Sequence, residues 1–115
     1  MSGRTPGKWI TDGAYTVMAE DSDQFNGNYA ICVTEGPDKI GNARLIAAAP
    51  ELLNMLERVV DNEEQRVLED WLSRERPSGD VDSVQSQWLS SYDYSEFCTD
   101  WQGPLDAIDK ARGIR

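Results

Sequence analysis

Apolar and polar residues alternate in the first third of the chain, within three short stretches: residues 8–11, 14–20 and 28–34. The apolar positions are Trp9, Tyr15, Val17, Tyr29, Ile31 and Val33. A period of two is typical of β-strands that turn one face toward a core. The dipeptides Asp12-Gly13 and Asn26-Gly27 separate the stretches and favour hairpin turns. The pattern predicts a three-stranded antiparallel β-meander over residues 8–34, with one face that a helix covers.

From residue 40 onward the apolar positions recur at helical spacing. Residues 41–60 are rich in alanine and leucine, which favour helix. Pro50 cannot donate a backbone hydrogen bond and disfavours helical geometry at Ala49, so we expect a kink or a new helix start there and favour two segments. Residues 61–76 predict a further amphipathic helix, which ends before Pro77.

The C-terminal part divides into an ambiguous stretch and a clear helix. Residues 80–101 carry apolar residues at helical spacing, but the serines and tyrosines that follow Leu89 favour a loop or a short turn. Gly103-Pro104 is typical of a helix start, and Gly113 of a helix end. The predicted fold class is therefore α+β, with the meander packed against a C-terminal helical region of three to five helices over residues 40–115. A length of 115 residues predicts a single domain, 1–115.

Negative charge changes the picture, because 21 acidic residues against 11 basic ones give a net charge of -10. Residues 61–109 form an acidic segment with thirteen carboxylates and only three arginines, Arg66, Arg74 and Arg76. This balance disfavours direct binding to nucleic acid or to anionic lipid and favours a basic partner. No apolar run approaches the roughly 20 residues of a membrane span, and the N-terminus lacks the apolar core of a signal peptide. We expect a cytoplasmic protein.

Candidate catalytic chemistry is sparse. The chain has no histidine, no glycine-rich phosphate loop, and two cysteines, Cys32 and Cys98, too far apart for a zinc pattern and expected to be free and buried. Adjacent acids such as Glu63 and Glu64 leave a carboxylate enzyme with a hard metal as the remaining option, but such acids are normally solvated charge. We predict no enzyme activity, no metal and no cofactor.

Aromatic and acidic residues are interleaved between residues 80 and 101, and two interpretations stay open. In the first, the aromatic side chains and carboxylates form an interface for an arginine-rich and lysine-rich surface, with acids in place of phosphates. In the second, the rings face the core and the acids face solvent, because the spacing of Trp88 to Tyr92 and of Phe97 to Trp101 is that of core-facing helix pairs. The candidate partner-binding residues are Glu63, Glu64, Asp70, Asp80, Asp82, Trp88, Tyr92, Asp93, Tyr94, Glu96 and Asp100. A pocket for a phosphorylated ligand requires arginines to converge with Tyr29 or Trp9, whereas Arg66 and Arg74 are expected to pair with Asp70.

Three motifs carry a resemblance: TPGKW at residues 5–9, NARLIAAAPELLNMLE at 42–57 and AIDKARG at 107–113. Together they resemble a family of small proteins encoded by tailed bacteriophages and prophages, with a TPGPW-like start, a short strand region, an NARLIAAAPELL helix and an AIxKA-type last helix. Lys8 stands where proline is commoner. The resemblance implies a phage accessory protein made in the cytoplasm of a bacterial host, and no catalytic residues.

Charge and resemblance together favour one hypothesis over two others. The leading hypothesis is an inhibitor of a bacterial defence or regulatory complex, of the anti-CRISPR or anti-defence type, that binds a basic host protein or nucleoprotein complex through an acidic, nucleic-acid-mimicking surface. The first alternative is a sponge that sequesters a nucleotide second messenger, as a homo-oligomer. The second is a phage structural or assembly protein.

Overall fold

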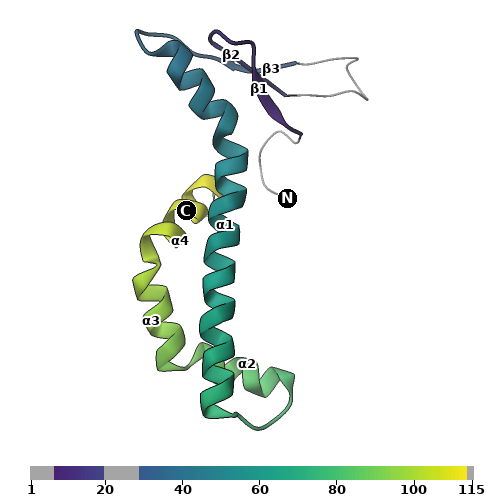
Figure 1. Cartoon of the computed structure of the whole chain (residues 1–115), viewed down its shortest axis with the longest axis vertical. Coiled ribbons are helices and arrows are strands. Elements are labelled where there is room, and N and C mark those ends of the chain that lie inside the picture. The colour runs from purple at the N-terminus through teal and green to yellow at the C-terminus, as the bar shows by residue number, and fades with distance from the viewer. Residues whose placement is uncertain (1–6, 20–28, 114–115) are drawn as a thin grey trace. The chain divides into compact units, whose positions relative to one another are not determined.

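The computed structural model describes residues 7–19 and 29–113. Within these residues, three strands precede four helices (Figure 1), which confirms the α+β class. Residues 1–54 and residues 55–115 form two compact units, the sheet unit and the helical unit, and each is described by itself. Among the described residues, no helix is both long enough and apolar enough to cross a membrane.

The strands form an antiparallel sheet of order β1-β2-β3, which confirms the predicted meander. Their bounds are Trp9–Thr11 for β1, Thr16–Ala19 for β2 and Tyr29–Val33 for β3. Asp12 and Gly13 open the first turn: Asp12 Oδ1 accepts the N–H groups of Ala14 and Thr16 at 2.8 and 3.2 Å, and Gly13 takes a φ of 86°. The Asn26-Gly27 turn lies outside the described residues.

Burial follows the predicted alternation in β2 but not throughout the sheet. Val17 and Ala19 are fully buried, whereas Val33 is 56% exposed and Tyr15 is 41% exposed. The pairing shows the reason: Val17 lies opposite Cys32 and Met18 opposite Ala30, so the register shifts by one residue and the alternation of β3 is interrupted. Tyr15 precedes β2, and its ring lies under the Lys39 ammonium group, 4.5 Å from the ring centroid.

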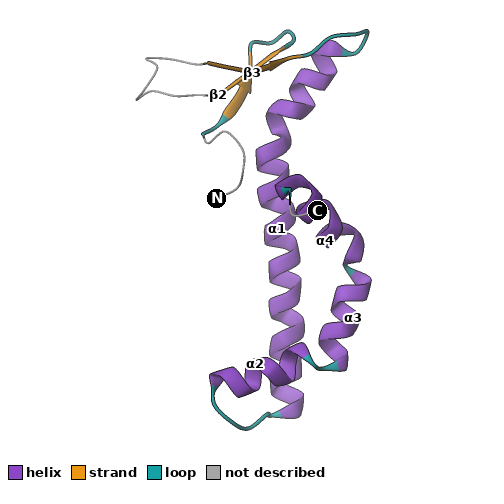
Figure 2. Cartoon of the chain, turned by 180° about the vertical axis from the view of Figure 1, so that it is seen from behind, coloured by secondary structure: helices purple, strands orange, loops and turns teal. Residues whose placement is uncertain are grey.

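A single helix, α1, runs from Lys39 to Glu75 with Pro50 inside it (Figure 2), so the expectation of two segments at Pro50 and a further helix from residue 61 is wrong. Proline removes one helix hydrogen bond, the one that the Ile46 carbonyl would accept. The residues on both sides are good helix formers, and neither glycine nor a second proline follows before Pro77. One missing bond is therefore tolerated inside a long helix.

Three short helices follow: α2 (Val81–Leu89), α3 (Tyr92–Asp100) and α4 (Gln102–Arg112). The ambiguous stretch therefore forms two helices, and each has a side-chain N-cap. Asp80 accepts the Ser83 N–H at 2.8 Å, and Ser91 accepts the Tyr94 N–H at 3.1 Å. The last helix is confirmed, and Gly113 ends it with a φ of 75°. Four helices fall within the predicted three to five.

The core of the helical unit is small and aromatic. Its buried side chains are Val60, Trp71, Trp88 and Phe97. The Trp88 ring lies between two others, with its centroid 5.5 Å from that of Trp71 and 5.4 Å from that of Tyr94. These contacts hold α2 and α3 beside the part of α1 that follows residue 55 (Figures 1 and 2).

Candidate functional site

Four of the predicted acidic residues surround one small hollow of about 120 Å³ in the helical unit. We call it the acidic hollow, and its carboxylates come from Glu63 of α1 and from Asp93, Glu96 and Asp100 of α3. Arg66 is the one cation among its described lining residues. The hollow brings together residues 30 or more positions apart in the sequence, which a pattern along one helix cannot show.

Arg66 is held by Glu63 and not by the predicted Asp70. The guanidinium donates to the Glu63 carboxylate through Nε at 3.1 Å and through an Nη atom at 2.5 Å. Both groups stay charged: the hydrogen bond from Arg66 lowers the pKa of Glu63, and the Glu63 carboxylate raises the pKa of Arg66. A spacing of three residues suits this pair as well as four would.

Arg74 joins the two sides of the helical unit. It forms the predicted pair with Asp70, at 3.5 Å, and also binds the Asp93 carboxylate of α3. Asp93 raises the pKa of Arg74 through this hydrogen bond. Asp93 also lies in the first turn of α3, where its negative charge interacts favourably with the positive end of the helix dipole and stabilises the helix. Asp93 therefore has a structural role, whereas the ion pairs among the described residues include neither Glu96 nor Asp100.

Tyr92 is the one exposed ring among the predicted aromatic site residues, with 76% of its surface exposed. Glu96 lies beside it and raises the pKa of its hydroxyl, because the hydroxyl donates a hydrogen bond to the Glu96 carboxylate. Asp100 and Asp93 raise the same pKa by their charge. The ring and the carboxylates of α3 thus lie within electrostatic reach of one another.

The other aromatics follow the core interpretation. Trp88 is 4% exposed, and Tyr94 is half-buried against it. Phe97 and Trp101 stack, with centroids 6.4 Å apart, as their spacing predicted. Trp88 and Tyr92 do not share a face, because α2 ends at Leu89 and α3 begins after the Ser91 cap.

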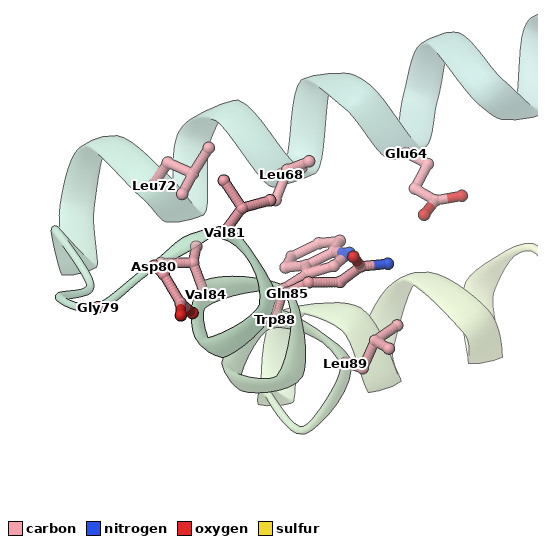
Figure 3. A pocket seen from close by; sticks show the side chains of 10 residues that line it. All are labelled: Glu64, Leu68, Leu72, Gly79, Asp80, Val81, Val84, Gln85, Trp88 and Leu89. Carbon is pink, nitrogen blue, oxygen red and sulfur yellow. The ribbon is translucent and has the colours of Figure 1, made fainter.

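A second surface of the helical unit takes two more of the predicted acids. Glu64 and Asp80 line an open groove of about 470 Å³ between α1 and α2 (Figure 3), which we call the apolar groove. Its apolar walls are Leu68 and Leu72 of α1 and Val81, Val84, Trp88 and Leu89 of α2. The sequence pattern did not predict this groove. The pair Leu68 and Leu72 was a visible signal, but nothing in the sequence showed that α2 would lie beside it.

The eleven predicted residues therefore do not form one face. Four surround the acidic hollow, Tyr92 lies beside Glu96, Glu64 and Asp80 line the apolar groove, and Trp88 and Tyr94 belong to the core. Asp70 pairs with Arg74, and Asp82 is exposed in the first turn of α2. Acidic side chains of the helical unit therefore lie at both the acidic hollow and the apolar groove.

The sheet unit contains a different cavity, of about 350 Å³. Residues of two sequence motifs meet there: Gly7, Lys8 and Trp9 precede or open β1, whereas Ala47, Pro50, Glu51 and Asn54 belong to α1. Its lining mixes an indole ring, an ammonium group, a carboxylate and an amide. The described lining residues include no arginine, so the convergence of arginines with Trp9 that a pocket for a phosphorylated ligand requires is not found there.

Within residues 7–19 and 29–113, no three or more acidic, cysteine or histidine side chains lie close enough together to hold a metal ion. Cys32 and Cys98 are free, as predicted, but half-buried and not buried. A hydrogen bond with the Cys98 side chain raises the pKa of Tyr94, so this thiol borders the aromatic core.

One family model matches residues 1–115, and the family is described as Salmonella phage P22 protein Y8K6. None of the curated proteins and none of the solved structures matches the chain. The match supports the phage origin that the sequence motifs implied.

Proposed function

We propose the following function for the chain, which belongs to the family of Salmonella phage P22 protein Y8K6. The protein is a phage accessory protein that inhibits a bacterial defence or regulatory complex, of the anti-CRISPR or anti-defence type, by stoichiometric binding. It uses the acidic hollow and Tyr92 as its binding surface. The partner is a basic host protein or nucleoprotein complex, and the protein works as a binder and not as an enzyme.

The observation that carries this proposal is the gathering of Glu63, Asp93, Glu96 and Asp100 around one hollow. Arg66 and Arg74 neutralise the first two, so Glu96 and Asp100 supply the charge that a partner meets. Carboxylates a few ångströms apart can accept the arginine and lysine side chains that otherwise hold phosphates. The acidic hollow is therefore suited to a surface built for nucleic acid.

Tyr92 adds the second property of a protein interface, an exposed ring beside the charges. Tyrosine offers a large contact area at low entropic cost, and rings of this kind are enriched among the residues that dominate binding energy. On a basic partner, the ring would lie against an arginine plane. Charge gives the rate and selectivity of association, and the ring gives dwell time.

The test begins with the full chain immobilised, a lysate of the bacterial host passed over it, and the retained proteins identified and purified. The affinity of the wild-type chain for the retained protein is then compared with that of the double variant Glu96→Lys and Asp100→Lys by calorimetry. We expect a loss of at least roughly tenfold, because two attractive contacts become repulsive. A partner that normally binds DNA or RNA should also lose that activity when the wild-type chain is added.

A matched control keeps the charge change but moves it. Glu35 and Glu69 are both exposed and lie outside the acidic hollow. The variant Glu35→Lys with Glu69→Lys should change the affinity by less than about twofold. Equal losses in both variants would mean that only net charge matters, and unchanged affinity in the first would reject the acidic hollow as the binding surface.

The cavity of the sheet unit favours a second candidate, sequestration of a small nucleotide-like ligand. Trp9 offers a ring for stacking, Asn54 an amide for a base edge and Lys8 a cation for phosphate. A panel of cyclic nucleotides tests it: a ligand that binds the folded chain raises the melting temperature, and Lys8→Gln should remove most of that rise. If no cyclic nucleotide raises the melting temperature, this candidate is rejected.

A further inference from the structure

The apolar groove has large aliphatic side chains that are exposed to solvent. Val81 is 80% exposed and Leu89 is 50% exposed, and both border the groove. Trp88, only 4% exposed, closes its floor (Figure 3). An apolar groove with an aromatic side chain as its floor and exposed aliphatic side chains at its edges is the usual form of a site that binds apolar side chains of a partner.

The charges at the groove identify the kind of partner. Glu64 of α1 and Asp80, which caps α2, both line it, and its described lining residues include neither lysine nor arginine. The Asp80 carboxylate is fixed there, because it also accepts the Ser83 N–H that begins α2. An apolar segment entering this groove therefore meets a carboxylate at each end (Figure 3), which favours one flanked by lysine or arginine.

The length of the groove identifies the shape of the partner. Val81 and Leu89 are eight residues apart on α2, so they lie about 12 Å apart along the helix axis. Two turns of a partner helix span the same length, and they present apolar side chains at positions i, i+4 and i+7 on one face. A second copy of this chain is a poor occupant, because a net charge of -10 on each copy opposes their approach.

We propose that the apolar groove between α1 and α2 binds an amphipathic helix of the partner, with apolar residues on one face and basic residues beside them. The proposal rests on the proposed function, since it names the structural element that the basic partner presents. The acidic hollow then contacts the folded surface of the partner, and the apolar groove takes one of its helices.

Synthetic peptides test the proposal on the full chain. The first probe is a fluorescein-labelled amphipathic peptide of about four turns, with leucines at helical spacing and lysines beside them. A second has glutamates in place of the lysines, and a third has serines in place of the leucines. Fluorescence anisotropy should show binding of the first at least roughly tenfold tighter than of the second or the third. Equal binding of all three would overturn the proposal.

Variants locate the binding. The double variant Val81→Ser and Leu89→Ser should weaken binding of the lysine peptide at least roughly fivefold, and Asp80→Ser should weaken it while keeping the cap of α2. Leu52→Ser is the matched control, because Leu52 is 55% exposed and lies in the sheet unit. Far-ultraviolet circular dichroism checks that each variant is folded. Unchanged binding by the groove variants, or an equal loss in the control, would overturn the proposal.

Other occupants of the groove give distinct results. If a second copy fills it, sedimentation shows a dimer that Val81→Ser and Leu89→Ser convert to a monomer, and the inference is rejected. If the purified host partner loses affinity for Glu96→Lys and Asp100→Lys but not for the groove variants, the proposed function stands and the groove inference fails. If neither double variant lowers the affinity for the partner, both the proposed function and the groove inference fail.

Discussion

Replacement of Trp88 by alanine tests the aromatic core of the helical unit. Trp88 is 4% exposed and contacts the rings of Trp71 and Tyr94. Burial of a tryptophan removes roughly 200 Å² from water, or about 5 kcal/mol at about 25 cal/mol per Å². Because Trp88 also forms the floor of an open groove, water can enter the space that alanine leaves. We expect a loss near the lower end of the usual range, about 3 kcal/mol.

Tyr92 is the matched comparison. Sequence spacing placed Trp88 and Tyr92 on one helix face, but Tyr92 is 76% exposed and belongs to the next helix. Tyr92→Ala should change the free energy of unfolding by no more than about 0.5 kcal/mol. The structure thus predicts a severalfold difference between two aromatic residues that the sequence pattern treats alike.

Urea denaturation followed by circular dichroism at the helix band measures both variants. With a slope of about 1.5 kcal/mol per molar urea, Trp88→Ala should lower the midpoint by roughly 2 M. Trp88→Phe should fall between the wild type and Trp88→Ala, because a smaller ring keeps part of the contact. A loss below about 1 kcal/mol for Trp88→Ala, or a comparable loss for Tyr92→Ala, would refute the described core.

Three further predictions concern single residues. Asp80→Ala should destabilise the chain by about 1 kcal/mol in urea denaturation and Asp80→Ser by much less, because serine also caps a helix; equal effects would contradict the cap. Pro50→Ala should raise the free energy of unfolding by about 1 to 3 kcal/mol, and with it the melting temperature, because alanine supplies the missing N–H to the Ile46 carbonyl. A lower melting temperature would contradict this. Asp12 accepts hydrogen bonds from the N–H groups of Ala14 and Thr16, which lowers the pKa of its carboxyl group in the folded state. The ionised carboxylate therefore stabilises the folded state at pH values above the pKa of Asp12 in the unfolded chain. This contribution is lost as the pH falls through the lower pKa of the folded state. Carbon-detected magnetic resonance of the Asp12 carboxyl group should show a midpoint below its ordinary value, and an ordinary or higher midpoint would reject the turn geometry.

Local signals predicted the elements whose causes are local. The first turn depends on Asp12 and Gly13, and the last helix depends on Pro104 and Gly113, which act within a few residues of their own positions. Pro50 misled the prediction because the favourable residues on both sides outweigh one lost hydrogen bond. The bulge after Val17 changed which residues of β3 face inward, and it arises from pairing between strands and not from either strand alone.

The candidate site needed long-range contacts to be found. Interleaved acids and rings indicated the right segment, but they could not show that Glu63 of α1 would join Glu96 and Asp100 of α3. Nor could they separate the exposed Tyr92 from the buried Trp88, because that difference depends on where α2 ends. The apolar groove likewise exists only because α2 lies beside α1.

Amide-resolved magnetic resonance of the full chain, with and without the purified host partner, tests the central claim most directly. The proposed function predicts that the largest shift changes lie in α3, at Tyr92, Glu96 and Asp100, and in α1 near Glu63. Residues 39–54 should change little. Changes confined to the sheet unit, or spread evenly over the chain, would contradict the acidic hollow as the binding surface.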